Sequence, residues 1–254
     1  MAFVEIEDFD RVRVLTLAHA KPTNPIGKPM AEAIMAALRE ADADQGVDAV
    51  VVTGGPDRSF SAGGDFNEAR LLEDDDLVNE TIDWCHDLYL TVLNTGKPTV
   101  AAIDHHAVGL GCQLAMMFDW KIMTSRADFW QPELQHGIGA SVGSTIFAAA
   151  VGYDVSRHII MSCRKLDADT SLSLRVVDEI CEPEVLLERA VQQAEHLGGY
   201  PRIAFTATKR VLTEHMRGAL ERTREESKAV HRASFGAKAM HSHFDNVLGT
   251  GAAR

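Results

Sequence analysis

A short stretch early in the sequence has the pattern of a strand that is followed by two glycines and then by a helix. It reads FSAGGDF, residues 60–66, and Gly63 and Gly64 precede a predicted helix start at Asp65. Amides at the start of a helix lack intrahelical acceptors and attract negative charge, and glycine lets a ligand approach them closely. Taken alone, the stretch is also typical of a plain tight turn.

A second stretch repeats this pattern about fifty residues later. In DHHAVGLGCQL, residues 104–114, a predicted strand leads through Gly109 into a short helix expected to reach Met117, and the amide of Leu110 would be a free donor. Taken alone, the glycines would serve packing. Two such junctions in one core could direct two amides at a single oxygen, and this predicts an oxyanion hole.

A third stretch supplies a carboxylate. In FWQPELQHGIGASVG, residues 129–143, Glu133 follows Pro132 and is surrounded by glycines. A carboxyl group in a small, partly apolar pocket has a raised pKa and suits acid–base work, although a single glutamate is more often a surface acid. The cysteines lack metal-ligand spacing, so no metal site is predicted, and we expect four small buried side chains: Cys85, Cys112, Cys163 and Cys181.

The composition indicates an ordinary globular protein. The chain has 254 residues, of which 46% are hydrophobic, enough for one large domain or one domain with a small appendage. Its net charge of −12 disfavours nucleic acid and anionic membranes as partners. The N-terminus lacks the basic start and apolar run of a signal peptide, and no apolar run reaches membrane-spanning length, so a cytoplasmic location is expected.

The elements that must position these stretches alternate between strands and helices, which predicts an α/β fold with a mostly parallel sheet. A hairpin is expected over residues 3–17 with its turn at Asp8 to Asp10, and a helix over 28–42 with Met30, Ile34, Leu38 and Ala41 on one face. Buried strands are expected at 47–54 and 97–104, short strands at 120–125 and 127–134, and helices from the acidic patch to about Asn94, over 184–197 and over 200–235. The last helix could pack on a neighbouring subunit or cover its own core.

Together, the three stretches resemble the crotonase superfamily, also called the enoyl-CoA hydratase/isomerase family, from about Val12 to about Lys209. The resemblance rests on FSAGGDF, KPTVAAIDHHAVGLGCQLAMMFD and ADFWQPELQHGIG in this order. It implies a spiral core of ββα turns over residues 1–200 and a helical trimerisation region over 201–254. It also implies an acyl-CoA substrate whose thioester oxygen lies between the amides of Gly64 and Leu110, with no cofactor.

The resemblance also implies smaller roles in the first loop. Ala62 and Asp65 would lie in the substrate-binding loop, with Asp65 near the CoA nucleotide or, alternatively, acting as a helix N-cap. His106 stands where the family usually has glycine. It would either change the shape of the pocket entrance or be a loop side chain without a functional role.

One position separates this chain from ordinary hydratases of the family. They use two glutamates, and the first is replaced here by Gln113, which leaves Glu133 alone. An amide does not exchange a proton at neutral pH, so hydration is disfavoured, while one-glutamate isomerases remain an alternative. Decarboxylation of a malonyl thioester fits one carboxylate, because loss of CO₂ forms the enolate without a base.

A closer resemblance is to one branch of the family, the carboxymethylproline synthases of carbapenem biosynthesis. It rests on RSFSAGGDFNE, QPELQHGIGASVG, SKAVHRASF and HFDNVLG. It implies that malonyl-CoA is decarboxylated, that the enolate adds to pyrroline-5-carboxylate or glutamate semialdehyde, and that the thioester is hydrolysed to 5-carboxymethylproline. Glu133 would then activate the water, Gln113 would hold a carboxylate or amide-like edge of a substrate, and His231 would line the acceptor pocket.

The match to this branch is incomplete at the acceptor side. Trp84 lies three residues from the position of the acceptor-facing tryptophan of these relatives, so it is only a candidate substrate-binding residue. The expected assembly is a homotrimer or a dimer of trimers. Two other functions stay open: a malonyl-CoA or methylmalonyl-CoA decarboxylase without an acceptor, and an RNA-binding protein of the same fold, which the charge of −12 disfavours.

Overall fold

Within the described residues, the main sheet has six strands in the order β1-β2-β3-β4-β6-β8. The computed structural model describes residues 2–69, 72 and 74–235. β1 and β2 are antiparallel, and every later neighbour in the sheet is parallel, as the alternation of elements predicted. The strands are β1 (Val4–Phe9), β2 (Val12–Leu17), β3 (Ala49–Thr53), β4 (Thr99–Ile103), β6 (Trp120–Thr124) and β8 (Glu179–Cys181).

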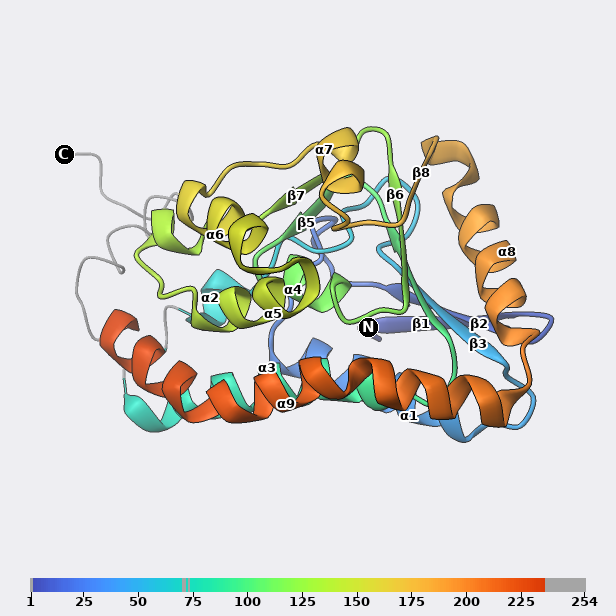
Figure 1. The fold of residues 1–254 in the computed structure, drawn as a ribbon, viewed down its shortest axis with the longest axis horizontal. Coiled ribbons are helices and arrows are strands. Elements are labelled where there is room, and N and C mark those ends of the chain that lie inside the picture. Colours follow the sequence, from blue (N-terminus) through green and yellow to red (C-terminus); the bar gives the residue numbers. More distant parts are fainter. Residues whose placement is uncertain (1, 70–71, 73, 236–254) are drawn as a thin grey trace.

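Helices cover both faces of this sheet (Figure 1). The α-helices are α1 (Lys28–Ala43), α2 (Phe66–Ala69), α3 (Asp75–Asn94), α4 (Leu110–Ala115), α5 (Ser141–Val151), α6 (Tyr153–Ser162), α7 (Ala168–Ser173), α8 (Leu186–Gly198) and α9 (Arg202–Phe235). The part of the chain that the structure describes also contains two 3₁₀ helices, η1 (Glu133–His136) and η2 (Pro183–Val185). Because both faces are covered, β3 and β4 are buried at every position, as their continuous apolar sequences predicted.

The side chains of the parallel strands alternate between two apolar layers. Val51 and Val100 pack under α8, against Leu186 and Ala190. Val50, Val52, Ala101 and Ile103 point the other way, into the larger core built with α1, α3 and α4. On α1, the predicted inward face is confirmed, because these residues are all buried: Met30, Ile34, Leu38 and Ala41.

A second, two-stranded sheet carries the functional loops. Its strands β5 (His106–Val108) and β7 (Asp128–Trp130) are parallel, with Ala107 opposite Phe129. Ser61 joins the edge of β5: its N–H donates to the His106 carbonyl at 3.0 Å, and the Val108 N–H donates to the Ser61 carbonyl at 2.9 Å. These bonds hold the first glycine stretch beside the second.

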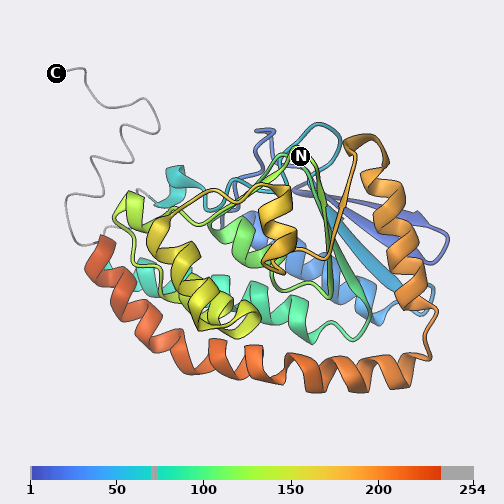
Figure 2. The same cartoon turned by 45° about the horizontal axis from the view of Figure 1, so that its top comes forward.

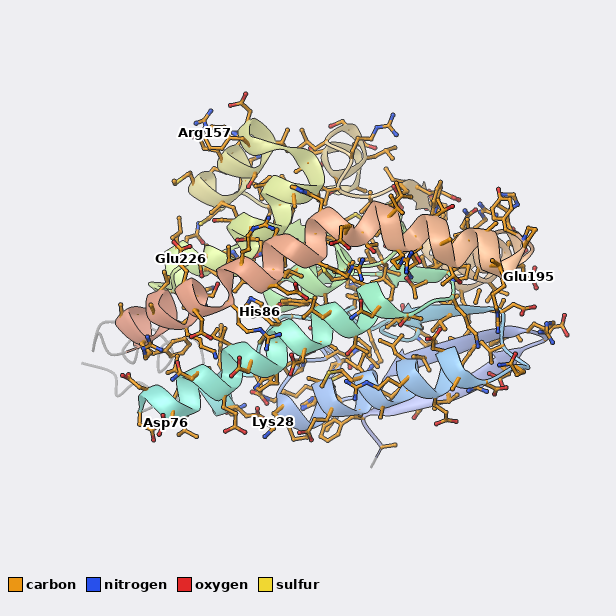
Figure 3. All side chains as sticks on the ribbon, turned by 60° about the horizontal axis from the view of Figure 1, so that its bottom comes forward. Lys28, Asp76, His86, Arg157, Glu195 and Glu226 are labelled. Carbon is orange, nitrogen blue, oxygen red and sulfur yellow. The ribbon has the colours of Figure 1, made fainter. Side chains whose placement is uncertain are left out.

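The long helix α9 lies along α3 and α5 of its own chain (Figure 2). Its N-terminal half is fastened by Lys209, a buried side chain that forms an ion pair with Asp119 at 2.6 Å and donates to the Lys97 carbonyl at 3.0 Å. Figure 3 shows His86 of α3 between α3 and α9, and that side chain is completely buried. The helix therefore packs on its own core, and this contact does not exclude the other arrangement that the sequence left open, packing on a neighbouring subunit.

Three local expectations were wrong. The hairpin turn lies at Asp10 and Arg11, because β1 continues to Phe9, which pairs with Val12, and Asp10 takes the left-handed conformation with φ 52°. β8 was not expected, since its three residues interrupt a helical stretch. Cys181 lies on this edge strand and is only partly buried, unlike the three other cysteines. The HFDNVLG stretch lies outside the described residues.

Candidate active site

A cavity of about 610 Å³ lies between the two glycine stretches, η1, α3 and α9. Most of its wall is apolar, with contributions from Ile82, Val142 and Phe235. The substrate-binding and catalytic residues predicted from the sequence all line it: Ala62, Gly64, Asp65, Trp84, Leu110, Gln113, Glu133 and His231. The fold thus collects at one cavity residues that lie up to 169 positions apart, from 62 to 231.

The two glycine stretches touch at Gly63. This residue has φ 95°, and a side-chain carbon on it would lie 2.7 Å from the Val108 carbonyl oxygen and 3.6 Å from the Leu110 nitrogen. Both the backbone conformation and the lack of space require glycine there. The close approach brings the amides that follow Gly63 next to the start of α4.

The amides of Gly64 and Leu110 are not used within the described part of the chain. Ile26 pairs with this loop through its flanking groups: Ile26 N–H donates to the Gly63 carbonyl at 2.7 Å, and Asp65 N–H donates to the Ile26 carbonyl at 3.1 Å. The Gly64 amide between them donates to none of the described residues. Leu110 is the first residue of α4, so its amide lacks an intrahelical acceptor.

Asp65 also has a structural use, as the alternative reading expected. Its Oδ1 accepts from the Asn67 amide at 2.9 Å and from the Asn67 side chain at 2.8 Å, which fixes the start of α2. Helix α2 begins at Phe66, one residue later than expected. Asp65 lines the cavity in addition to this capping role.

Glu133 begins η1 and lies next to the second glycine stretch. A side-chain carbon on Gly109, which has φ 52°, would lie 3.3 Å from Glu133 Oε1. Gln113 Nε2 donates to the same oxygen at 2.9 Å. Burial of the carboxyl group raises the pKa of Glu133 to about 7, and the hydrogen bonds from its own backbone and from Gln113 oppose that rise. At neutral pH the protonated and ionised forms of Glu133 are therefore both populated, so the group can act as an acid or as a base.

Two further side chains support this carboxyl group, one directly and one through Gln113, and were not singled out from the sequence. Gln131 is buried, and in the orientation that satisfies both ends of its amide it donates to the Glu133 carboxylate oxygens at 2.6 Å. Tyr89 of α3 donates its hydroxyl to Gln113 Oε1 at 2.8 Å. Gln131 stood inside a stretch already marked, whereas Tyr89 lies 24 residues before its partner and has no local signal.

His231 and Trp84 form the wall where α9 faces α3. His231 Nδ1 lies 2.7 Å from the Ser227 carbonyl, which only accepts hydrogen bonds, so Nδ1 carries the proton and Nε2 is the nitrogen left for a ligand. Burial lowers the pKa of His231. At neutral pH the ring is therefore uncharged, and its Nε2 is an acceptor. Its ring also stacks on Phe235.

His106 does not occupy the backbone position at which the family resemblance predicted a glycine. It lies within β5, where its Nδ1 is 3.0 Å from Asp128 Oδ2. The left-handed conformation that favours glycine belongs to the preceding residue, His105, with φ 51°. The expectation was thus one residue out of register, and His106 is not among the residues that line the cavity.

The described residues contain no group of three or more histidine, cysteine, aspartate or glutamate side chains placed to hold a metal ion. Within the same part of the chain, no helix combines the length and hydrophobicity that a membrane span requires.

Comparison with known proteins agrees with this geometry. Residues 8–246 match the family model described as enoyl-CoA hydratase/isomerase. The carboxymethylproline synthase of Pectobacterium carotovorum subsp. carotovorum is 46% identical over 243 residues, which are 96% of this chain and 97% of that protein. The mitochondrial enoyl-CoA hydratase of Pongo abelii is 30% identical, over 88% of this chain and 75% of that protein.

Solved structures show the same relationship. ThnE from S. clavuligerus superposes with a TM-score of 0.77 at 30% identity, over 89% of this chain and 100% of that chain. An enoyl-CoA hydratase/isomerase from Mycobacterium paratuberculosis superposes with a TM-score of 0.87 at 23% identity, over 97% and 98% of the two chains, which shows the shared fold. The chain therefore belongs to the enoyl-CoA hydratase/isomerase family, the crotonases, and is a crotonase enzyme similar to carboxymethylproline synthase.

Proposed function

We propose that this enzyme makes 5-carboxymethylproline from malonyl-CoA and pyrroline-5-carboxylate, or its open form glutamate semialdehyde. The observation that carries the proposal is the pairing of one carboxyl group, Glu133, with a neutral amide, Gln113, beside two free backbone amides. The 46% identity to a carboxymethylproline synthase supports it. A hydratase would need a second acid–base group where Gln113 stands.

The first step uses the backbone amides. When the bond between the malonyl carboxylate carbon and C2 breaks, CO₂ leaves and the electron pair moves into the thioester, which becomes an enolate. Negative charge collects on the thioester oxygen, where the N–H groups of Gly64 and Leu110 would stabilise it. No base is required, and the apolar wall around the cavity favours loss of charge from the departing carboxylate.

The second step forms the carbon–carbon bond. The enolate carbon attacks the imine carbon of pyrroline-5-carboxylate in its N-protonated, iminium form. The electrons of the carbon–nitrogen double bond become the lone pair of the ring nitrogen, which keeps the proton that it brought and ends as a neutral amine. Trp84 and His231 would bound the acceptor, because they line the cavity between α3 and α9. Gln113 retains little capacity for a substrate, since both ends of its amide already bind protein side chains.

The third step releases the free acid. Glu133 in its ionised form would take a proton from water, the resulting hydroxide would add to the thioester carbon, and the same two amides would hold the tetrahedral oxyanion. Collapse of this intermediate breaks the carbon–sulfur bond, and the protonated Glu133 returns its proton to the CoA thiolate. A carboxyl group with a pKa of about 7 suits both transfers.

This assignment predicts different pH dependences for the two half-reactions. Hydrolysis needs ionised Glu133, so its rate should rise with pH, with a midpoint near pH 7, and then level off. Release of CO₂ does not use this base and should lack that midpoint. Quenched-flow measurements of CO₂ and free acid between about pH 5.5 and 8.5, roughly one and a half units on each side of the midpoint, would separate them. A shared midpoint would contradict the assignment of Glu133 to hydrolysis alone.

Product mass tests the function as a whole. Purified enzyme with malonyl-CoA should give 5-carboxymethylproline when pyrroline-5-carboxylate is present, and acetyl-CoA in its absence. Acetyl-CoA as the sole product under both conditions would identify a decarboxylase without an acceptor. Rapid hydration of crotonyl-CoA would instead identify an ordinary hydratase, and either result would overturn the proposal.

The proposed assembly is a trimer or a dimer of trimers. Large apolar side chains are exposed on the first half of α9, with Ile203, Val211 and Leu212 each more than two-thirds uncovered in the single chain. Contact between copies would bury them. We expect sedimentation velocity to show a trimer or hexamer, and Val211→Glu to shift it toward smaller species. A wild-type monomer with full activity would refute this.

A further inference from the structure

Tyr89 is a buried phenol behind the carboxyl group of the site. It lies near the C-terminal end of α3 and is 1% exposed, packed in the main core. Its hydroxyl donates to Gln113 Oε1 at 2.8 Å, the one hydrogen bond that this hydroxyl makes within the described residues. In the proposed reaction Tyr89 has no chemical step of its own, so its hydroxyl calls for another explanation.

The hydroxyl decides which way the Gln113 amide faces. A primary amide has nearly the same shape when its oxygen and nitrogen are exchanged, so only its neighbours fix its orientation. Here the oxygen faces Tyr89, and the nitrogen faces Glu133 at 2.9 Å and Gln131 at 3.2 Å. The exchanged orientation would direct an oxygen at the carboxylate and leave the buried Tyr89 hydrogen without an acceptor, which is unfavourable.

Charged side chains line other parts of the cavity, at Lys28, Asp65, Glu68 and Glu80, but the described influences on the pKa of Glu133 are its burial, its own backbone and Gln113. From α3, α4 and α9, the titratable side chains on this side of the cavity include Tyr89, Cys85, Cys112 and His231. Burial keeps the phenol and the two thiols protonated and the imidazole uncharged at neutral pH. Helix α5, which also faces it, has no titratable side chain, and His136 follows it on η1. The carboxylate form therefore depends on amide donors.

We propose that Tyr89 is a positioning residue: its hydroxyl locks the Gln113 amide with the nitrogen toward Glu133 and so maintains the carboxylate that activates water. The inference rests on the proposed function, because it assigns Tyr89 to the hydrolysis step. The chain of contacts runs from the Tyr89 hydroxyl through Gln113 to Glu133, and each link is a hydrogen bond between buried or partly buried groups.

The substitution Tyr89→Phe tests this by removing only the hydroxyl while the ring stays in the core. The Gln113 amide is then free to turn, one donor to the carboxylate is weakened, and the midpoint of the Glu133 titration should rise by on the order of one pH unit. Carbon-13 NMR of protein labelled at the glutamate carboxyl carbon would report it, with the Glu133 signal assigned by its loss in Glu133→Gln. The pH midpoint of thioester hydrolysis should shift equally, while CO₂ release keeps its profile.

Two further variants separate positioning from a general loss of packing. In a Gln113→Leu background, Tyr89→Phe should cause no additional shift, because the link between the two residues is already missing. Thr124→Val removes another buried hydroxyl, one that binds Asp104 at 2.7 Å away from the cavity, and should leave the Glu133 midpoint unchanged.

An unchanged midpoint in Tyr89→Phe, or an equal shift in both backgrounds, would overturn the inference. The NMR titration needs no substrate. An enzyme that fails to make carboxymethylproline and a Tyr89 that fails to act on Glu133 would therefore give separate results.

Discussion

Glu133→Ala is expected to lose release of free 5-carboxymethylproline by about two to four orders of magnitude while CO₂ release continues. Hydrolysis of the thioester needs an activated water, and Glu133 is a carboxyl group that lies next to Gly109, the residue before the Leu110 amide, and is hydrogen-bonded to Gln113. Decarboxylation needs only stabilisation of the enolate oxygen. The CoA thioester of carboxymethylproline should therefore accumulate, together with acetyl-CoA from enolate that is protonated before it meets the acceptor. Mass spectrometry of quenched reactions would measure all three products.

The matched control for this variant is Glu184→Ala, which removes an exposed carboxylate from η2, outside the residues that line the cavity. It should keep the wild-type ratio of CO₂ to free acid. If Glu133→Ala releases free acid at the wild-type rate, water is activated by another group and the proposed mechanism is wrong. If both activities fall together, Glu133 is required before hydrolysis and its assignment to the last step is wrong.

Gly64→Pro is expected to slow decarboxylation by about 10²–10³, the cost of removing one oxyanion-hole donor elsewhere. Proline has no N–H, and the Gly64 amide is one of the two proposed oxyanion donors. The substitution removes none of the hydrogen bonds to Ile26, because these are made by Gly63 and Asp65. Stopped-flow detection of CO₂ from malonyl-CoA, without acceptor, would isolate this step.

Gly64→Ala provides the control, since it adds a side chain and keeps the amide. A side-chain carbon on Gly64 has no protein atom within 4 Å, and Gly64 lacks the positive φ of its neighbour Gly63. The alanine variant should fold, as judged by circular dichroism, and lose much less activity than the proline variant. Near-normal CO₂ release by a folded Gly64→Pro would rule out this amide as an oxyanion donor.

The parts of the site that the sequence predicted are those encoded by neighbouring residues. A strand, a glycine and a helix start lie within a dozen residues, so the Gly63–Gly64 pair and the Leu110 amide could be singled out from local pattern, and the glycines around Glu133 predicted its raised pKa. The family resemblance then assigned Gly64 and Leu110 as the two oxyanion donors. Trp84 and His231 came from the family resemblance instead. Their presence at one cavity became visible only in the folded chain.

The parts that the sequence did not predict depend on contacts between distant residues. The support of Glu133 through Gln113 begins at Tyr89 on another helix, and a lone tyrosine on an amphipathic helix has the pattern of an ordinary core residue. The course of α9 is fixed partly by Lys209 and Asp119, which lie 90 residues apart. A lysine within a charged helix is ordinarily a solvated residue, so this buried ion pair had no signal in the sequence.

The burial of Glu133 has a thermodynamic consequence for the whole protein. In the unfolded chain this group has a pKa near 4.5, and in the folded enzyme about 7, so between these values the native state holds a proton that the unfolded state releases. The contribution of Glu133 to stability is therefore fully present below pH 4.5 and is lost as the pH rises through 7, by roughly 3 kcal/mol. The contribution of Glu133 to stability is thus smallest in the alkaline range, where this base is most fully ionised. An apolar side chain at this position would not lower the free energy of unfolding at high pH in this way. Glu133 is therefore a single side chain at which stability is lost in favour of activity.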